Sequence, residues 1–320
     1  MSNRSIITPE VDAQYQSELL MRANFQLLHE QFAKDLSIEA RGGSRVARFR
    51  RYVNINPATT PLTEGVSPSG SSPTIVNITK TLAQYGDFIP FNDVVTLESV
   101  DPVIAELSGI SGDQMGETKD VLCRESLHAG TSVFYGGGRV SRVTVATGDN
   151  LTQTMLDKVV EGLKAQKAKK VTPMINASDK INTSPVASSY IGYCNPNGTR
   201  QIKALSSFVS VEKYSSTMSI LPGEVGKTDD IRWIETNNGK VFTGAGSGGI
   251  DVVSMVVFGA EAYGKVPMND STAEMILKPL GSSGSSDPLN QRGTVGWKTT
   301  TGYLILNDNF ISRIEVAKLP

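Results

Sequence analysis

The chain has 320 residues, of which 39% are hydrophobic and 20% are charged, and its formal net charge is −1. This length leaves room for two packed subdomains, and the composition excludes a disordered chain and a nucleic-acid binder that is basic throughout. No run of about 18 apolar residues is present, so we expect no transmembrane helix, and the first residues lack the apolar stretch of a secretion signal.

The first predicted element is an amphipathic helix over residues 10–36. Leu28, Phe32 and Leu36 follow one another at four-residue intervals, which places them on one helix face. Glycine follows a few residues later, at Gly42, and is typical of a helix end. We therefore expect an N-terminal helix with one apolar side.

The region from about residue 45 to residue 95 predicts two strands joined by a long loop. Its flanks are rich in Val, Ile, Phe and Tyr, and its centre is rich in Pro, Ser, Thr and Gly. This composition favours a strand, a loop and a second strand in turn. Because a loop of this length is unusual inside a compact domain, we expect it to project outward.

Five arginines lie within eleven residues at the start of this region, with no acidic residue among them: Arg41, Arg45, Arg48, Arg50 and Arg51. Such a run can be a solvated surface near a helix end. It can also bind the phosphates of DNA or clamp the carboxylates of a neighbouring subunit, because the guanidinium group forms bidentate pairs with both. We favour the clamp, since the cluster adjoins the long loop and the whole chain is not basic.

Residues 101–130 are predicted to form a long helix. Asp101 can cap its N-terminus, Pro102 suits the first helical position, and apolar residues recur along it. Glycines in its middle cost about 1 kcal/mol each relative to alanine. We therefore expect the helix to be held by packing or to be bent.

The remainder of the chain predicts short strands and two further helices. The helices are expected over 151–169 and 197–206. The strands are expected over 189–194, 231–236, 251–258, 273–279, 293–299 and 302–306. Since strands and helices do not alternate regularly, this order favours an α+β fold with antiparallel strands over a parallel α/β sheet.

Two glycine motifs resemble nucleotide-binding loops, but their context does not fit. Gly226, Lys227 and Thr228 match the end of a P-loop, yet Leu221 stands where the first glycine is needed and a strand-like segment follows. Gly244 opens a G-x-G-x-x-G match, but strand-forming residues follow it where a dinucleotide fold needs a helix. We predict that neither segment binds a nucleotide.

The residues that most often carry metal or catalytic chemistry are few and scattered. Cys123 and Cys194 are far apart, and neither they nor His29 and His128 have a neighbour at metal-ligand spacing. No nucleophile elbow and no zinc-protease histidine pair is present. We predict no disulfide framework, no cofactor and no metal site, and an enzyme of unfamiliar type stays open as an alternative.

Five segments, taken together and in order, resemble those of one family. They are PLTEGVSPSG (61–70), QYGDFIPFNDVV (84–95), HAGTSVFYGGG (128–138), PGEVGKTDDIRWIETNNGKVF (222–242) and KPLGSSGSSDPLNQRGTVGWK (278–298). On these segments the chain resembles the major capsid proteins of tailed bacteriophages, in the family of the phage N-four coat protein. The resemblance runs from about residue 55 to the C-terminus.

The resemblance implies the Hong Kong ninety-seven fold, which is an α+β capsid fold. It implies five regions with these boundaries: an N-terminal arm over 1–50, an extended loop built as a β-hairpin over 51–95, a peripheral domain with a spine helix over 96–145, a mainly axial domain over 146–295, and a C-terminal strand over 296–320 that returns to the peripheral domain.

The resemblance also implies a function and partners. We expect a major capsid protein, not an enzyme, that self-assembles into an icosahedral shell around a double-stranded DNA phage genome. The alternative with the same fold is an encapsulin-like nanocompartment shell. The expected partners are copies of the chain in pentamers and hexamers, DNA on the inner face, and portal, scaffold or cement proteins, with no membrane. We expect assembly in the host cytoplasm and a final place in the virion.

The residues expected at contacts between subunits belong to the arginine cluster and to the projecting loop. A loop without a core of its own becomes ordered by packing on a neighbour. The candidates are the five arginines named above together with Pro61, Leu62, Glu64, Gly65 and Pro68.

Overall fold

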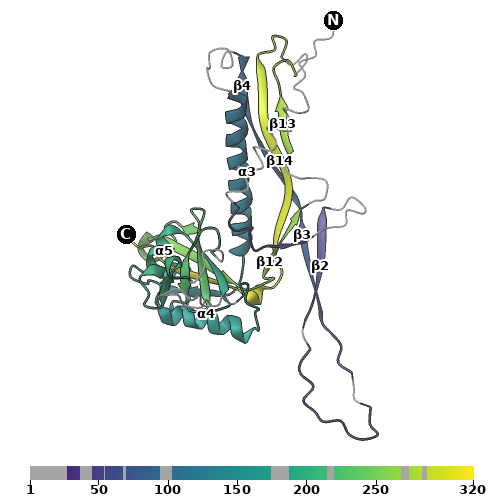
Figure 1. Cartoon of the computed structure of the whole chain (residues 1–320), viewed down its shortest axis with the longest axis vertical. Coiled ribbons are helices and arrows are strands. Elements are labelled where there is room, and N and C mark those ends of the chain that lie inside the picture. The colour runs from purple at the N-terminus through teal and green to yellow at the C-terminus, as the bar shows by residue number, and fades with distance from the viewer. Residues whose placement is uncertain are drawn as a thin grey trace.

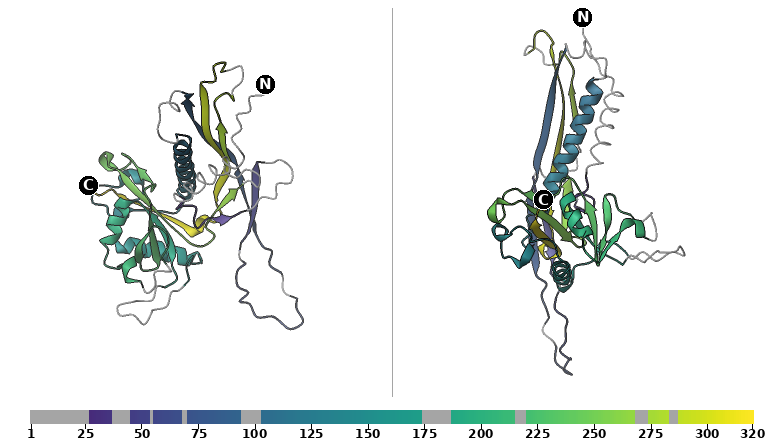
Figure 2. Two further views of the ribbon diagram at one scale, coloured as in Figure 1. Left: turned by 45° about the horizontal axis from the view of Figure 1, so that its top comes forward. Right: turned by 90° about the vertical axis from the view of Figure 1, so that its left-hand side faces the viewer.

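The structure is a computed structural model that describes residues 27–36, 45–53, 55–67, 70–93, 103–173, 187–214, 220–267, 274–282 and 287–320. A tall part contains helix α3 and a long twisted sheet, a rounder part lies beside its lower end, and a loop extends below both (Figure 1). The turned views show the same two parts and the same projecting loop (Figure 2).

The sheet of the tall part has five strands, with the longest strand at its centre. Its members are β1 (Lys34–Asp35), β4 (Ala83–Asn92), β12 (Tyr263–Pro267), β13 (Glu274–Lys278) and β14 (Arg292–Ile305). β14 pairs antiparallel with β4 on one side and with β12 and β13 on the other, and β1 adds a parallel edge to β12.

The predicted break in β14, between strands 293–299 and 302–306, is wrong. Thr300 and Thr301 continue the pairing, opposite Gln84 and Ala83 of β4. Threonine is β-branched and packs well on a pleated surface. A continuous ladder with β4 therefore carries the strand through the position where we expected a turn.

Helix α3 (Val103–Leu127) confirms the helix predicted over 101–130, within the described residues. The side that it buries is made mostly of small residues: Ser108, Gly109, Ser111, Gly112 and Gly116, around Met115. Small side chains let a helix approach a sheet closely. Glycine weakens an isolated helix, but here it allows α3 to lie close to the sheet. The helix is therefore held by packing.

Side chains also tie α3 to two strands of the sheet. Trp297 Nε1 of β14 donates a hydrogen bond to Gln114 Oε1 at 3.0 Å, and Gln114 Nε2 donates to Asp87 Oδ2 of β4 at 2.7 Å. Around these contacts Phe91, Met115, Met275, Val295 and Trp297 form a buried apolar cluster. The tall part thus has a core of its own.

An antiparallel pair of strands, β2 (Val46–Tyr52) and β3 (Ile75–Thr81), forms the base of the projecting loop. Ala47 packs with Leu82, Val266 and Leu304 in a small buried cluster at this base. The chain between the two strands leads away from the rest of the molecule (Figure 1). The outward projection predicted for this loop is confirmed.

The rounder part is built on a mixed sheet of eight strands. They are β5 (Val133–Tyr135), β6 (Tyr190–Cys194), β7 (Phe208–Ser210), β8 (Glu224–Thr228), β9 (Ile231–Glu235), β10 (Val241–Phe242), β11 (Val252–Phe258) and β15 (Ile311–Ala317). Helices α4 (Gln153–Ala165) and α5 (Pro196–Lys203) share one buried cluster with it. The end of α3 and residues 28–36 share a second.

Two of the expected ranges include strands that pair with the long β14. The range 51–95 includes β4, which belongs to the five-stranded sheet beside α3 and not to the hairpin. The range 146–295 includes β12 and β13, which lie in that same sheet. In each case the strand pairs with the long β14, a contact that spacing along the chain does not reveal.

Residues 296–320, expected as one C-terminal strand that returns to the peripheral domain, contain the end of β14 and the separate strand β15. β15 pairs antiparallel with β11 and parallel with β5 in the eight-stranded sheet. Ile311, Ile314 and Val316 are buried there, so the apolar side chains of β15 belong to the core of the rounder part. The range 96–145 likewise includes β5, which joins this sheet.

The end of the predicted N-terminal helix is also wrong. Residues 28–32 form turns, and β1 follows at Lys34–Asp35, paired with Gly264 and Lys265. Residues 10–26 lie outside the described residues. The four-residue spacing of Leu28, Phe32 and Leu36 therefore reflects a segment whose apolar side chains meet different neighbours and not one helix face.

Candidate assembly surfaces

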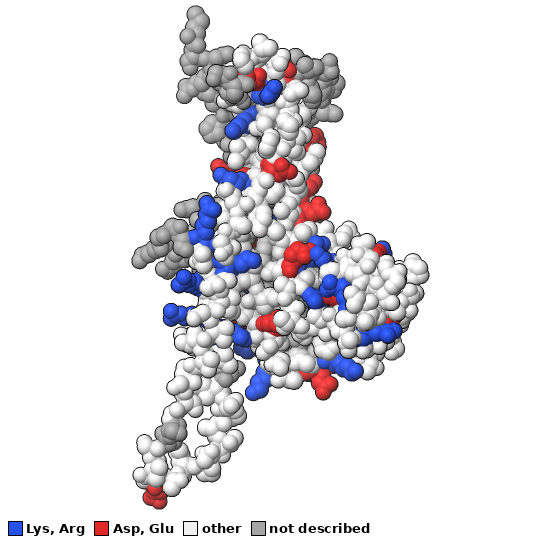
Figure 3. All heavy atoms as spheres, turned by 180° about the vertical axis from the view of Figure 1, so that it is seen from behind, with Lys and Arg blue, Asp and Glu red and all other residues white. Residues whose placement is uncertain are grey.

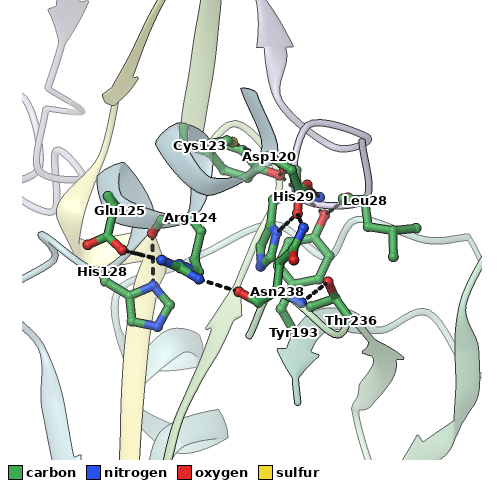
Figure 4. A network of polar contacts seen from close by, with 11 residues as sticks. Leu28, His29, Asp120, Cys123, Arg124, Glu125, His128, Tyr193, Thr236 and Asn238 are labelled. Carbon is green, nitrogen blue, oxygen red and sulfur yellow. Dashed lines mark hydrogen bonds and ion pairs between the residues drawn. The ribbon is translucent and has the colours of Figure 1, made fainter. Parts of the chain in front are cut away.

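Residues 27–36, here called the strap, cross the joint where the tall part meets the rounder part. The backbone N–H of His29 donates to Asp120 Oδ1 of α3 at 2.8 Å, and its ring Nδ1 lies 2.8 Å from Asp120 Oδ2 (Figure 4). Asn238, which follows β9, donates to the same Oδ2 at 3.2 Å. Since Asp120 is fully buried, one carboxylate joins the helix, the strap and the rounder part.

The carbonyl groups of the strap are held from both parts as well. Tyr263 of β12 donates to the His29 carbonyl at 2.6 Å, and the Cys123 thiol of α3 lies 3.4 Å from it. Tyr193 of β6 donates to the Leu28 carbonyl at 2.7 Å (Figure 4). A buried backbone carbonyl without a partner is costly, so these hydroxyl groups stabilise the crossing.

Burial keeps one thiol and two hydroxyl groups of the joint uncharged. Burial raises the pKa of the Cys123 thiol and of the Tyr193 and Tyr263 hydroxyls well above their usual ranges. They remain protonated at neutral pH and act as hydrogen-bond donors. Burial lowers the pKa of His128, at the end of α3, to about 3, so this imidazole is neutral.

The two cysteines lie in different places and are both buried. Cys123 is on α3, and Cys194 ends β6, where burial raises the pKa of its thiol to about 12. In the described part of the chain, no group of three or more His, Cys, Asp or Glu side chains is placed to hold a metal ion. In the same residues, no helix is long and apolar enough to cross a membrane.

The arginine cluster divides between the two faces of the hairpin base. Arg48 and Arg50 of β2 are exposed and share one face with Tyr52, opposite Thr79 and Asn77. Arg51 is half-buried and lies on the other face, with Phe49 and Ile78. Arg45 is exposed just before the strand. Arg41 lies outside the described residues.

The exposed arginines have no acidic partner among the described residues. The ion pairs observed over 27–36, 45–93 and 103–320, gaps excepted, include neither Arg45, Arg48, Arg50 nor Arg51. Basic side chains gather along this side of the hairpin base (Figure 3). Arg45, Arg48 and Arg50 therefore present positive charge that no acidic side chain of the described residues neutralises.

The loop candidates lie near the far end of the projection. Pro61, Leu62, Glu64 and Gly65 are all exposed, and the Leu62 side chain is 78% exposed. Gly65 has a positive φ of 78°, which glycine adopts at little cost in a turn. Pro68 lies outside the described residues. The structure thus brings the loop candidates together and separates them from the arginines.

The segment that resembles a P-loop is part of a sheet. Gly226, Lys227 and Thr228 lie in β8, paired with β7 on one side and β9 on the other. A Cβ at Gly226 would stand 2.5 Å from the Val209 carbonyl oxygen, so the glycine permits close strand packing. Gly244 begins a turn between β10 and β11, and its N–H donates to Asp251.

A family model described as phage capsid protein matches residues 92–267, more than half of the chain. The chain belongs to the phage capsid protein family. The major capsid protein of Pseudomonas phage KPP21 is 25% identical to this capsid protein in an alignment of 270 residues that covers 74% of the chain and 67% of the relative. The chain is a phage major capsid protein, a structural component of the virion that assembles from copies of itself. This function agrees with the sequence analysis.

Solved structures extend the likeness to the fold. The capsid of Ralstonia phage GP4 superposes with a TM-score of 0.71 at 11% identity, over 90% of this chain and 88% of that one. The capsid of cyanophage Pam1 gives 0.64 at 13% identity, over 99% and 95%. The Hong Kong ninety-seven-like α+β fold is confirmed, and the family match favours a phage capsid over a nanocompartment shell.

Proposed function

We propose that copies of this capsid protein close an icosahedral shell of pentamers and hexamers around a double-stranded DNA genome, and that they do so in the host cytoplasm. The observation that carries this proposal is the projecting loop between β2 and β3, together with the family match. An isolated subunit gains little from holding Leu62 and Val66 exposed on such a loop. The same side chains are buried if a neighbouring copy receives them.

We assign the parts of the subunit to places in the shell on the same basis. The rounder part would be the axial domain near the centre of each ring, and the tall part with α3 would be the peripheral domain. Portal, scaffold or cement proteins would bind the assembled shell, and DNA would face its inner side. We propose no catalytic activity, since the buried tyrosines and Cys123 of the joint serve as donors to backbone carbonyls.

Light scattering and electron microscopy of the purified protein test the proposal. We expect pentamers, hexamers or closed shells that form with increasing protein concentration. A sharp monomer mass at every concentration and salt would contradict it. Nuclease-treated shells from infected or expressing cells should also retain protected DNA only when the packaging proteins are present.

The arginine cluster is proposed as a clamp on carboxylates of the next subunit, with DNA contact as its competitor. The two readings differ in the stage at which they act. A clamp is needed before DNA enters, so replacing Arg48, Arg50 and Arg51 by Ser should prevent empty shells. Normal empty shells that package or retain less DNA would instead support the DNA contact.

A further inference from the structure

Helix α3 carries an acidic stripe on the side that it does not pack against the sheet. Glu106, Ile110, Asp113 and Glu117 follow at intervals of four, three and four residues, which keeps them within about 60° of one another around the helix. Glu106, Ile110 and Glu117 are exposed, and the Ile110 side chain is 52% exposed. The stripe is about 16 Å long at 1.5 Å per residue.

The exposed arginine face of β2 matches this stripe in charge. Arg48 and Arg50 are separated by about 7 Å along the strand, so both fit within the roughly 16 Å between Glu106 and Glu117 along the helix. Tyr52 is 62% exposed at one end of the arginine face, and Ile110 adds an exposed apolar side chain within the stripe. No ion pair within the described residues uses Glu106 or Glu117.

The two surfaces lie on opposite sides of the tall part, so they cannot meet within one subunit. In the view from behind, basic side chains gather on the left over the hairpin base, and acidic ones on the right over α3 (Figure 3). Complementary patches on opposite sides of one molecule make a head-to-tail contact, and such contacts close into rings. Duplex DNA fits the arginine face but would be repelled by the stripe.

We propose that the arginine face of one copy, Arg48 and Arg50, binds the acidic stripe of the next copy through Glu106 and Glu117. This inference rests on the proposed shell function and names the carboxylates that the clamp holds. Exposed ion pairs contribute modestly each and weaken with salt. Repeated around a ring, they set the register of neighbours and reject copies in other orientations.

Charge reversal with rescue tests the contact. We expect E106K/E117K, and separately R48E/R50E, to raise the protein concentration needed for shell formation at least about tenfold, equal to roughly 1.4 kcal/mol. The four-fold reversal R48E/R50E/E106K/E117K should restore assembly. As a matched control, E161K/E212K changes the charge equally at exposed positions outside both surfaces and should leave assembly unchanged.

A mixing experiment adds a sharper result. An equal mixture of the two double variants can alternate around a hexamer, where each contact then joins opposite charges, but not around a pentamer. We expect hexamers to return without closed icosahedral shells. If E106K/E117K assembles like the wild type, or if the folded four-fold variant does not assemble, the inference is wrong. Failure of the wild type itself to assemble would instead contradict the proposed function.

Discussion

The joint under α3 and the loop beyond β2 are built in opposite ways within one chain. At the joint, His29 and Asp120 are buried, and their polar groups are satisfied by side chains from both parts of the molecule. On the loop, Leu62, Glu64 and Gly65 are exposed and contribute to no buried cluster of the described residues. The joint is therefore completed within one subunit, whereas the loop leaves exposed the side chains for which we propose a place on a neighbouring copy.

Removal of the Asp120 carboxylate should have the largest effect on subunit stability. Replacing Asp120 by Ala leaves the ring of His29 and the side-chain amide of Asn238 without their buried acceptor. Removing the carboxylate partner from a buried pair of this kind costs about 3–5 kcal/mol of unfolding free energy. Urea unfolding of the subunit, below its assembly concentration, measures this loss. Glu117→Ala, exposed on the same helix, should change stability by about 0.5 kcal/mol or less.

Acid should destabilise the joint through His128. Because burial lowers its pKa from 6.5 to about 3, the unfolded chain takes up a proton that the folded chain refuses as pH falls below 6.5. Stability should then fall with pH, by up to about 1.4 kcal/mol per unit. Between pH 6.5 and 5, where few carboxylates titrate, His128→Gln should flatten this dependence. An unchanged slope would show that the imidazole is charged in the folded subunit.

Deletion of residues 62–72 should leave the subunit folded and block assembly. The loop buries little in the isolated subunit, so we expect a change of about 1 kcal/mol or less in unfolding free energy. Sedimentation of shells gives the assembly result. A variant with residues 62–67 replaced by a Gly-Ser segment of equal length separates loss of side chains from loss of reach. Normal shells from the deletion would mean that the loop is not an assembly element.

The smallest effect is expected at Lys227. Lys227 lies in a strand that is paired on both sides and not in a phosphate-binding loop. Lys227→Ala should therefore change the unfolding free energy by no more than about 0.5 kcal/mol. Titration with ATP or GTP should detect no binding to either protein. Nucleotide binding that disappears in the variant would overturn the interpretation of this segment as a strand without phosphate affinity.

Local spacing was enough for most elements of this chain. The helix at 101–130, the strand at 251–258 and the outward loop follow from periodicity and from the positions of glycine and proline, and α3, β11 and the hairpin confirm them. The stripe of Glu106, Ile110, Asp113 and Glu117 could also have been found, because its spacing is helical.

Pairing across long distances lay beyond the sequence. His29 and Asp120 are 91 residues apart, and nothing in either neighbourhood marks them as partners. The continuity of β14 depends on β4, about 200 residues earlier in the chain. The place of β15 depends on whether β11 or the five-stranded sheet covers its apolar residues.

The sequence by itself determined the long helix, several of the strands and the outward loop, where positive charge gathers, and, through five ordered motifs, the family of capsid proteins. Side-chain periodicity and backbone preference act over a few residues, so they can be read without the fold. Only the tertiary structure decided that Arg48 and Arg50 face outward while Arg51 turns to the other face, and that Asp120 holds the strap. Those outcomes depend on which surfaces are covered when distant segments pack together.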